Sequence, residues 1–231
     1  MALKGQMSRA MLNLSLLALN ISLAFHFIPL STSEGIGSRS KNFRDFSNSL
    51  ERGGTDILRG VYVSNTLALP IVQQPAGDSN YVSGKNGEAT QFATASQYGN
   101  IGLLAHNFLS GKSFSQLAIG QEVRLLFDDG HVEYFVISEI LRYKALEPGN
   151  PYSNFQNLSN QDEILSAGEM FNRVYVGKHH VTFQTCIAAD GKSSWGRLFV
   201  VALPKPKHLG LSSWNAYDFP RDFSLNGGHL P

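Results

Sequence analysis

The chain contains one cysteine, Cys186, and it stands among residues that could support thiol chemistry. A thiolate that attacks a carbonyl needs a nearby acid or base, and a donor for the negative charge that builds on the carbonyl oxygen. Arg197 lies inside the apolar run WGRLFVVAL, shortly after Cys186, and His106 ends the apolar run NIGLLAH. The sequence therefore offers the three kinds of side chain that a nucleophilic cysteine requires.

Each of these residues also has a plainer interpretation. A free cysteine often packs as a small apolar group in a core. A histidine at a strand end can be a surface residue, and an arginine can be one partner of a surface ion pair. Arg197 fits its plainer interpretation least well, because an unpaired guanidinium within an apolar strand is costly to bury. We therefore expect Arg197 to face a polar cleft.

The other histidines are weaker candidates for a role beside the thiol. His180 shares strand parity with Cys186, but six residues at about 3.3 Å each place it about 20 Å away, too far for proton transfer. The pair His179 and His180 could suggest a metal site, yet no cysteine or carboxylate cluster accompanies it. We predict that this pair lies on a strand surface.

Composition limits the classes of protein to which the chain can belong. Its 231 residues suffice for one domain with a full core plus extra segments. A hydrophobic content of 42% with only 16% charged residues predicts a folded chain. The formal net charge of +1 gives no reason to expect a nucleic-acid partner. One cysteine cannot form a disulfide within the chain, so packing must supply the stability.

The first 30 residues predict export. Lys4 and Arg9 precede residues 10–30, which contain no Asp, Glu, Lys or Arg and, as a helix, would span about 30 Å of hydrocarbon. We predict a signal anchor over residues 1–30; a cleaved signal peptide and a buried soluble helix remain alternatives, because polar residues interrupt the run. The predicted location is the cell membrane, with one span and an extracytoplasmic domain, or alternatively the secreted fraction.

Short apolar runs between Gly, Pro, Asn and Asp turns predict strands after a polar tether over residues 31–54. The expected strands cover residues 57–63, 67–72, 101–105, 122–128, 131–143, 174–186 and 195–203. Asp129-Gly130 supplies the two-residue turn of the clearest hairpin, QEVRLLFDDGHVEYFVI. The pattern favours an all-β barrel or sandwich over residues 55–204, followed by a tail over 205–231.

Two further expectations concern the surroundings of Cys186. If its strand runs antiparallel to that of Arg197, the two side chains end at similar height on neighbouring strands. The long connection between Lys144 and Arg173 is of a size that often carries function. Within it, Ser159 and Asp162 have capping-box spacing, which predicts a short helix through residues 164 and 165.

Three strings resemble one family. Thr182-Phe-Gln-Thr-Cys186 resembles the TLxTC signature of sortases, with Phe183 where leucine is usual. GNIGLLAHNF resembles the stretch that leads to the sortase histidine, with Ala105 where glycine is frequent, and WGRLFVVA resembles the strand that carries the sortase arginine. The order His, Cys, Arg also matches. The resemblance covers residues 57–203 and implies an eight-stranded closed β-barrel with one or two short loop helices, behind an N-terminal hydrophobic helix.

The resemblance implies a cysteine transpeptidase with His106, Cys186 and Arg197 as catalytic residues. Cys186 would cleave a Thr-Gly-type bond in the LPxTG-like sorting signal of a secreted protein, and an amine from the cell wall or a pilin would resolve the thioester. No metal or organic cofactor is implied; some sortases use calcium, for which no site is assigned here. The alternative is a catalytically weak sortase-like barrel that binds extracellular peptides or wall polymers. Retention of all three residues favours the enzyme.

Overall fold

Ten strands and four short helices make up residues 42–206, the part of the chain that the computed structural model describes. The strands are β1 (Leu58–Val63), β2 (Leu67–Gln73), β3 (Ala89–Phe92), β4 (Ile101–Leu104), β5 (Glu122–Phe127), β6 (Val132–Ala145), β7 (Phe155–Asn157), β8 (Ile164–Leu165), β9 (Val181–Ala189) and β10 (Lys192–Pro204). The helices are α1 (Phe43–Asn48), α2 (Ala93–Ser96), α3 (Gly111–Phe114) and α4 (Ala167–Tyr175). The hydrophobic segment expected over residues 1–30 and most of the expected tail lie outside the described residues. No helix within residues 42–206 has the length and hydropathy needed to cross a membrane.

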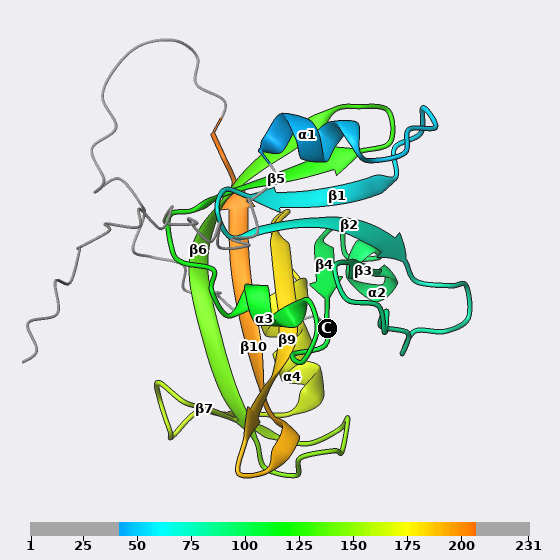
Figure 1. Ribbon diagram of the computed structural model, residues 1–231. Coiled ribbons are helices and arrows are strands. Elements are labelled where there is room, and N and C mark those ends of the chain that lie inside the picture. Colours follow the sequence, from blue (N-terminus) through cyan, green and yellow to red (C-terminus); the bar gives the residue numbers. More distant parts are fainter. Residues whose placement is uncertain (1–41, 207–231) are drawn as a thin grey trace, which may run out of the picture. The chain divides into compact units, whose positions relative to one another are not determined.

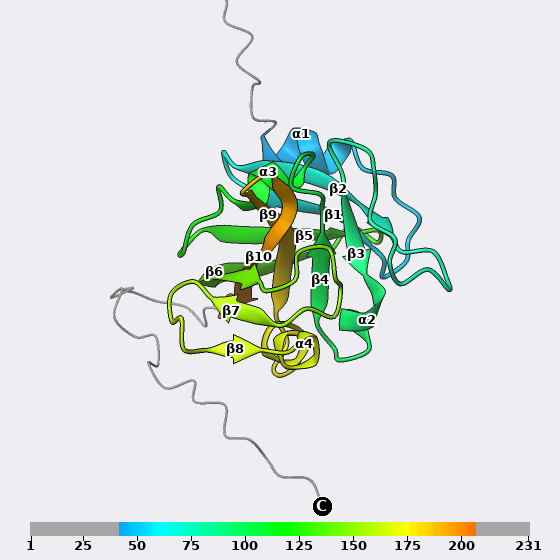
Figure 2. The same ribbon diagram turned by 90° about the horizontal axis from the view of Figure 1, so that it is seen from below.

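Eight of the strands close into a barrel, as the resemblance implied, which decides between the barrel and the sandwich that the strand pattern left open. They pair in the order β10-β9-β4-β3-β2-β1-β5-β6, and β6 pairs with β10 to complete the ring (Figure 1). β7 and β8 continue from β6 outside this ring and lie near α4, as the view from below shows (Figure 2). Most pairs are antiparallel, but β4 runs parallel to β9. The carboxyl ends of β4 and β9 therefore lie at the same end of the barrel.

The barrel interior is filled by apolar side chains from alternate positions of the strands. In β9, Val181 and Phe183 are fully buried in this core, while Gln184 between core positions points to the other face. Phe114 of α3 reaches into the same core and meets the Phe183 ring edge-on at 5.1 Å between centroids. Phenylalanine in place of the usual leucine at position 183 is therefore accommodated as a core residue.

The expected hairpin around Asp129-Gly130 joins β5 to β6. Gly130 adopts a φ of +92°, which a residue without a Cβ reaches at no steric cost. Just before the turn, Asp128 accepts hydrogen bonds from the Thr55 hydroxyl at 2.6 Å and from the Arg59 guanidinium at 2.9 Å. The Thr55 hydroxyl and then Arg59 lower the pKa of Asp128 to about 2. This carboxylate ties the chain ahead of β1 to the end of β5.

α1 lies within the segment that the sequence predicted to be a polar tether. Asn42 caps the helix by accepting a hydrogen bond from the backbone of Asp45 at 2.9 Å. Phe46 is only 2% exposed and stacks on Tyr62 of β1 with ring centroids 6.1 Å apart. The end of the segment therefore packs on the outside of the barrel, where Figure 1 shows α1 along β1.

α4 corrects two predictions about the long connection after β6. Residues 164 and 165, expected to be helical, form β8, and the helix begins after Ser166 instead. The true capping box is Ser166 with Glu169, whose carboxylate accepts from the Ser166 backbone at 2.8 Å. The strand expected from Val174 to Cys186 starts only at Val181, because Val174 and Tyr175 end the helix.

His180 fastens the end of α4 to the barrel, and it is buried rather than on a strand surface as predicted. It is 6% exposed, with Nε2 2.9 Å from the Val174 carbonyl oxygen and Nδ1 2.7 Å from the Lys178 carbonyl oxygen. The buried Asn100 accepts from the His180 backbone N–H and donates to the Tyr175 carbonyl, both at 2.8 Å. These contacts hold α4 against β9 and the start of β4.

Candidate active site

Cys186 and Arg197 lie directly opposite each other in the β9–β10 hairpin. The antiparallel register pairs these two residues, and opposite residues project from the same face of a sheet. The hairpin turns at Asp190-Gly191, where both residues have positive φ, +51° and +70°. Both Cys186 and Arg197 are half-buried, so the thiol is not sealed in the interior. The predicted antiparallel pairing at similar height is confirmed.

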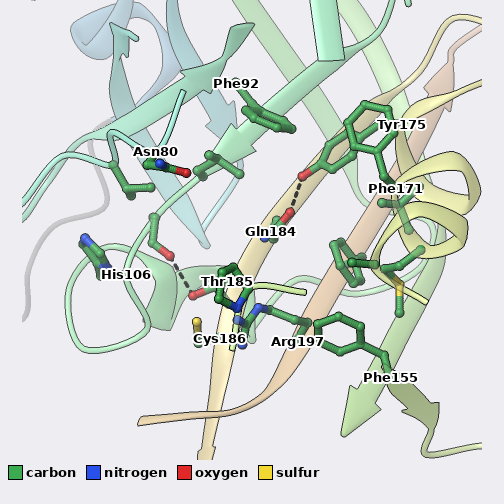
Figure 3. Close-up of a pocket in the computed structure, with 18 of the residues that line it drawn as sticks. Asn80, Phe92, His106, Phe155, Phe171, Tyr175, Gln184, Thr185, Cys186 and Arg197 are labelled. Carbon is green, nitrogen blue, oxygen red and sulfur yellow. Dashed lines mark hydrogen bonds between the residues drawn. The ribbon is translucent and has the colours of Figure 1, made fainter. Parts of the chain in front are cut away.

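His106 comes to the same place from β4. The parallel register pairs Leu104 with Gln184, and the Ala105 N–H donates to the Gln184 carbonyl at 3.3 Å. His106 follows directly, beside the second half of β9, where the strand continues past Cys186 to Ala189 rather than ending at Cys186 as expected. His106, Cys186 and Arg197 line one cavity of 440 Å³, and Cys186 is drawn between the other two in Figure 3. The structure thus places all three predicted residues on the wall of one cavity.

A buried hydrogen bond joins the two halves of this site. The Thr185 hydroxyl donates to the Ala105 carbonyl oxygen at 2.8 Å, and Thr185 is only 4% exposed. Gly111 packs against this bond: an added Cβ would collide with the Thr185 hydroxyl and approach the His106 carbonyl oxygen to 2.7 Å. The Gly111 N–H also donates to the His106 carbonyl oxygen at 3.0 Å. The turn after β4 is therefore fixed to β9 beside Cys186.

The residues that follow His106 also fix its loop. Asn107 donates through its side-chain amide to the Ser193 carbonyl of β10 at 2.9 Å. The ring of Phe108 stacks on the His106 imidazole with centroids 5.2 Å apart and an interplanar angle of 18°. Phe108 is nevertheless 60% exposed, so one face of the stack is open to solvent.

Arg197 keeps most of its donors free for a ligand. Its Nη1 donates to the carbonyls of Ser194 and Gly196, at 3.3 Å and 3.0 Å. Within residues 42–206 the other guanidinium nitrogens make no hydrogen bond, although the group carries five N–H donors. Phe155 lies beside it, 5.7 Å from guanidinium carbon to ring centroid. The expected polar cleft is in fact a largely apolar cavity with a charged edge.

Comparisons with known proteins find similar solved structures but no sequence match. No family model matches the sequence, and no curated protein matches it. The structure is similar to sortase A of Listeria monocytogenes, at 12% identity and a TM-score of 0.43, covering 66% of this chain and 89% of that one. It is similar to sortase C-1 of Actinomyces oris, at 14% identity and a TM-score of 0.45, covering 66% of this chain and 74% of that one. It is similar to a sortase D5 transpeptidase of Clostridium perfringens, at 16% identity and a TM-score of 0.39, covering 68% of this chain and 83% of that one. Sortases are also the family that the strings around Cys186 resemble.

Sequence reasoning missed most of the cavity wall. Many wall residues are aromatic or aliphatic and come from four elements, β3, β7, β10 and α4. They are Phe92, Phe155, Phe199, Met170, Phe171, Val174 and Tyr175. Val174 and Tyr175, the last residues of α4, were expected to belong to a strand, so the helix and its cavity-facing residues were not predicted. The spacing of Ser166 and Glu169 before the apolar residues of α4 was the available signal. Phe155 carried no local signal, because its place depends on the pairing of β7 with β6.

Candidate metal ligands do not gather near the site. Within the described part of the chain, no group of three or more His, Cys, Asp or Glu side chains is arranged to hold a metal ion. His179, one half of the pair considered above, lies with Nδ1 2.6 Å from the Gly99 carbonyl oxygen and Nε2 3.8 Å from Glu133. Its polar neighbours among the described residues are thus a backbone carbonyl and one carboxylate, and its ring lies 5.6 Å from that of Phe135.

Proposed function

We propose that this protein is a sortase-type cysteine transpeptidase. The observation that carries the proposal is the register that sets Cys186 opposite Arg197, with His106 at the end of the adjoining strand and on the same cavity. A nucleophile, a proton carrier and a cationic donor around one accessible space are what acyl transfer through a thioester needs. The strings around these residues add family resemblance to that arrangement.

In the first half-reaction, the Cys186 thiolate attacks a peptide carbonyl carbon and forms a C–S bond. The free N–H groups of Arg197 stabilise the negative charge on the carbonyl oxygen in the transition state. The C–N bond of the peptide then breaks, and protonated His106 gives its proton to the departing amine. The products are a thioester on Cys186 and a released amino-terminal amine.

In the second half-reaction, an incoming amine attacks the thioester carbonyl. His106, now neutral, accepts the proton that the amine loses as the new C–N bond forms. The C–S bond breaks and returns the thiolate of Cys186. Water in place of the amine gives hydrolysis, and either path leaves the enzyme unchanged.

The proposed partners and location follow from the same resemblance. The acyl donor is a secreted protein with an LPxTG-like sorting signal, and the acceptor is an amine of the cell wall or of a pilin. The apolar segment over residues 10–30 anchors the protein in the cell membrane, with the barrel outside the cytoplasm. Signal-anchored placement would bring the cavity near emerging secreted chains.

The test incubates the full-length protein in detergent with a peptide library and a short glycine peptide as amine. Mass spectrometry then identifies the peptide bond cut, the thioester on Cys186 and the amide formed with glycine. Cys186→Ala should abolish all three signals while leaving the circular dichroism spectrum unchanged. Peptide binding without any thioester would instead support the binding-module alternative, and neither binding nor acylation would reject both.

A further inference from the structure

One hydrogen bond inside the cavity is not explained by the three reacting groups. The Tyr175 hydroxyl donates to the Gln184 side-chain carbonyl oxygen at 2.5 Å, and both residues line the cavity (Figure 3). Gln184 occupies the variable position of the string Thr182-Phe-Gln-Thr-Cys186. It shares a strand face with the nucleophile, since side chains two residues apart in a strand point the same way.

Tyr175 is held rigidly as the donor in this bond. The residue is 2% exposed, and burial raises the pKa of its hydroxyl above the ordinary value, so the proton stays in place. The rings of Phe92 and Phe171 pack around it, with centroids 5.2 Å and 5.3 Å away. The backbone carbonyl of Tyr175 is itself held by Asn100. The hydroxyl is therefore a fixed reference for the orientation of the Gln184 amide.

A fixed carbonyl oxygen fixes the amide nitrogen as well. With Oε1 turned to Tyr175, the two N–H donors of Nε2 point away from that residue. Within residues 42–206, Gln184 Nε2 makes no hydrogen bond, and it is not sealed away from solvent. The same cavity is lined by the rings of Phe92 and Phe171 and by Met170, and also by the polar residues Ser79 and Asn80. An oriented pair of donors thus stands in a mostly apolar cavity that also holds Cys186.

We propose that Gln184 selects acyl-donor peptides that carry a side-chain hydrogen-bond acceptor, a carbonyl, carboxylate or sulfoxide oxygen. This inference rests on the proposed function, because only a transpeptidase would use the bound peptide as an acyl donor. Gln184 and Cys186 are about 7 Å apart along β9, and an extended peptide advances about 3.3 Å per residue. With the reach of the Gln184 side chain added, the acceptor falls within three residues of the cleaved bond.

The physical basis is the cost of leaving a donor unpaired. A ligand that covers Gln184 Nε2 with an apolar group removes its water and supplies no acceptor, which costs about 1–3 kcal/mol. Sites built to hydrogen-bond a ligand discriminate strongly against the analogue that lacks the matching group. Methionine and methionine sulfoxide form a matched neutral pair for this purpose, because the sulfoxide adds one acceptor to the same side chain.

The experiment measures two quantities on the full-length protein with peptides that carry methionine or its sulfoxide at each of the three positions on either side of the cleaved bond. One is the rate of thioester formation at Cys186, and the other is the Kd for the Cys186→Ala protein. We expect the sulfoxide peptide to be preferred about 10-fold at one position, in both measurements. Equal values for the two peptides at all positions, or a preference for methionine, would overturn the inference.

Three variants separate orientation from simple polarity. Gln184→Glu keeps an acceptor for Tyr175 but has no donors, so the sulfoxide preference should reverse and a lysine-bearing peptide should gain. Gln184→Met should erase the preference without reversing it, and Tyr175→Phe should weaken it by freeing the amide. Gln116→Glu makes the same change at an exposed position outside the cavity and should match wild type.

The outcomes distinguish this inference from the proposed function. Sulfoxide-selective binding without any thioester would reject the transpeptidase and keep the role of Gln184. Thioester formation at equal rates for the methionine and sulfoxide peptides would support the transpeptidase and reject the role of Gln184. Unchanged selectivity in both Gln184→Glu and Gln184→Met would also reject it, whichever variant folds less well.

Discussion

The two halves of the candidate site are held in different ways. Cys186 and Arg197 stand on paired strands of one hairpin, where the ladder of backbone hydrogen bonds fixes their relative height. His106 stands in a turn after β4, held by the Thr185 bond, the Asn107 bond and an exposed stack with Phe108. Cys186 and Arg197 are thus set by paired strands, whereas His106 is set by backbone bonds of a turn, from the Leu109 and Gly111 N–H groups to its carbonyl oxygen, and by a few side-chain contacts.

This difference matches what each group must do in the proposed reaction. A stabilising charge acts best when it is preorganised and does not move during the reaction. A proton carrier has to serve first the leaving amine and then the incoming one, so a limited freedom of the imidazole is useful. The following variants test each half, from the largest expected effect on turnover to the smallest.

The strand-borne half is tested most directly by Arg197→Ala. Loss of one oxyanion donor should lower the rate of thioester formation about 10²–10³-fold. Arg197→Lys should recover little, because an ammonium does not reproduce the planar fork of donors. Arg44, exposed on α1, gives the matched control as Arg44→Ala. Quenched-flow mass spectrometry reads the rate, and unchanged turnover would remove Arg197 from the mechanism.

The joint between the halves is tested by Gly111→Ala. The new methyl group meets the Thr185 hydroxyl and the carbonyls of Ala105 and His106, so the turn must shift. A displacement of about 1 Å in a catalytic group can cost about 10²-fold, and we expect a loss between 10-fold and that value. Gly168→Ala is the control, since open space surrounds its added Cβ. Equal turnover in the two variants would show that the turn tolerates movement.

The loop-borne half is tested by Phe108→Ala. An aromatic pair contributes about 0.5–1.5 kcal/mol beyond its buried area, so loss of the stack should lower turnover about 2-fold to 10-fold. The fold should be unaffected, because Phe108 is mostly exposed. Ile119→Ala removes a similarly exposed apolar side chain elsewhere. A rise in turnover would mean that the stack holds His106 away from its working position.

A region outside the site should separate stability from turnover. Asp128 has a folded-state pKa of about 2, below its ordinary 3.8, so its stabilising effect is present above pH 4 and is lost as pH falls toward 2. Asp128→Asn should therefore lower the urea midpoint at pH 7, and the gap to wild type should shrink toward pH 2. Turnover at pH 7 should not change, and Asp162→Asn, at an exposed position, serves as control. A gap that stays constant with pH would contradict the role of this carboxylate.

Local patterns predicted those parts of the structure whose cause is local. The β5–β6 hairpin follows from alternating side chains around Asp129-Gly130, and the β9–β10 hairpin follows from two apolar runs around Asp190-Gly191. The short strand β3 was missed, because its four residues include Thr90 and Gln91 and its pairing with β2 and β4 is what makes it a strand. Tertiary contacts decide such segments.

The candidate site divides in the same way. The three predicted side chains, His106, Cys186 and Arg197, were selected from their types and from the strings around them, and the structure places them on one cavity. The cavity wall and the Tyr175 contact with Gln184 were not, because they depend on where α4 docks. The docking is fixed by the buried pair Asn100 and His180, in which Asn100 bonds backbone groups of Tyr175 and His180 that are 75 and 80 residues away. No periodicity in the sequence reports such a contact.

The parallel pairing of β4 with β9 also bears on the order in which the site assembles. Ala105 and Thr185, joined at this seam, are 80 positions apart, whereas the hairpin that carries Cys186 and Arg197 closes within a short stretch of chain. Contacts between remote segments generally form more slowly than local ones. The thiol should therefore spend the early part of folding as an ordinary cysteine and gain its imidazole only when the ring closes. Barrel closure would then be the folding step that places the His106 imidazole beside the Cys186 thiol.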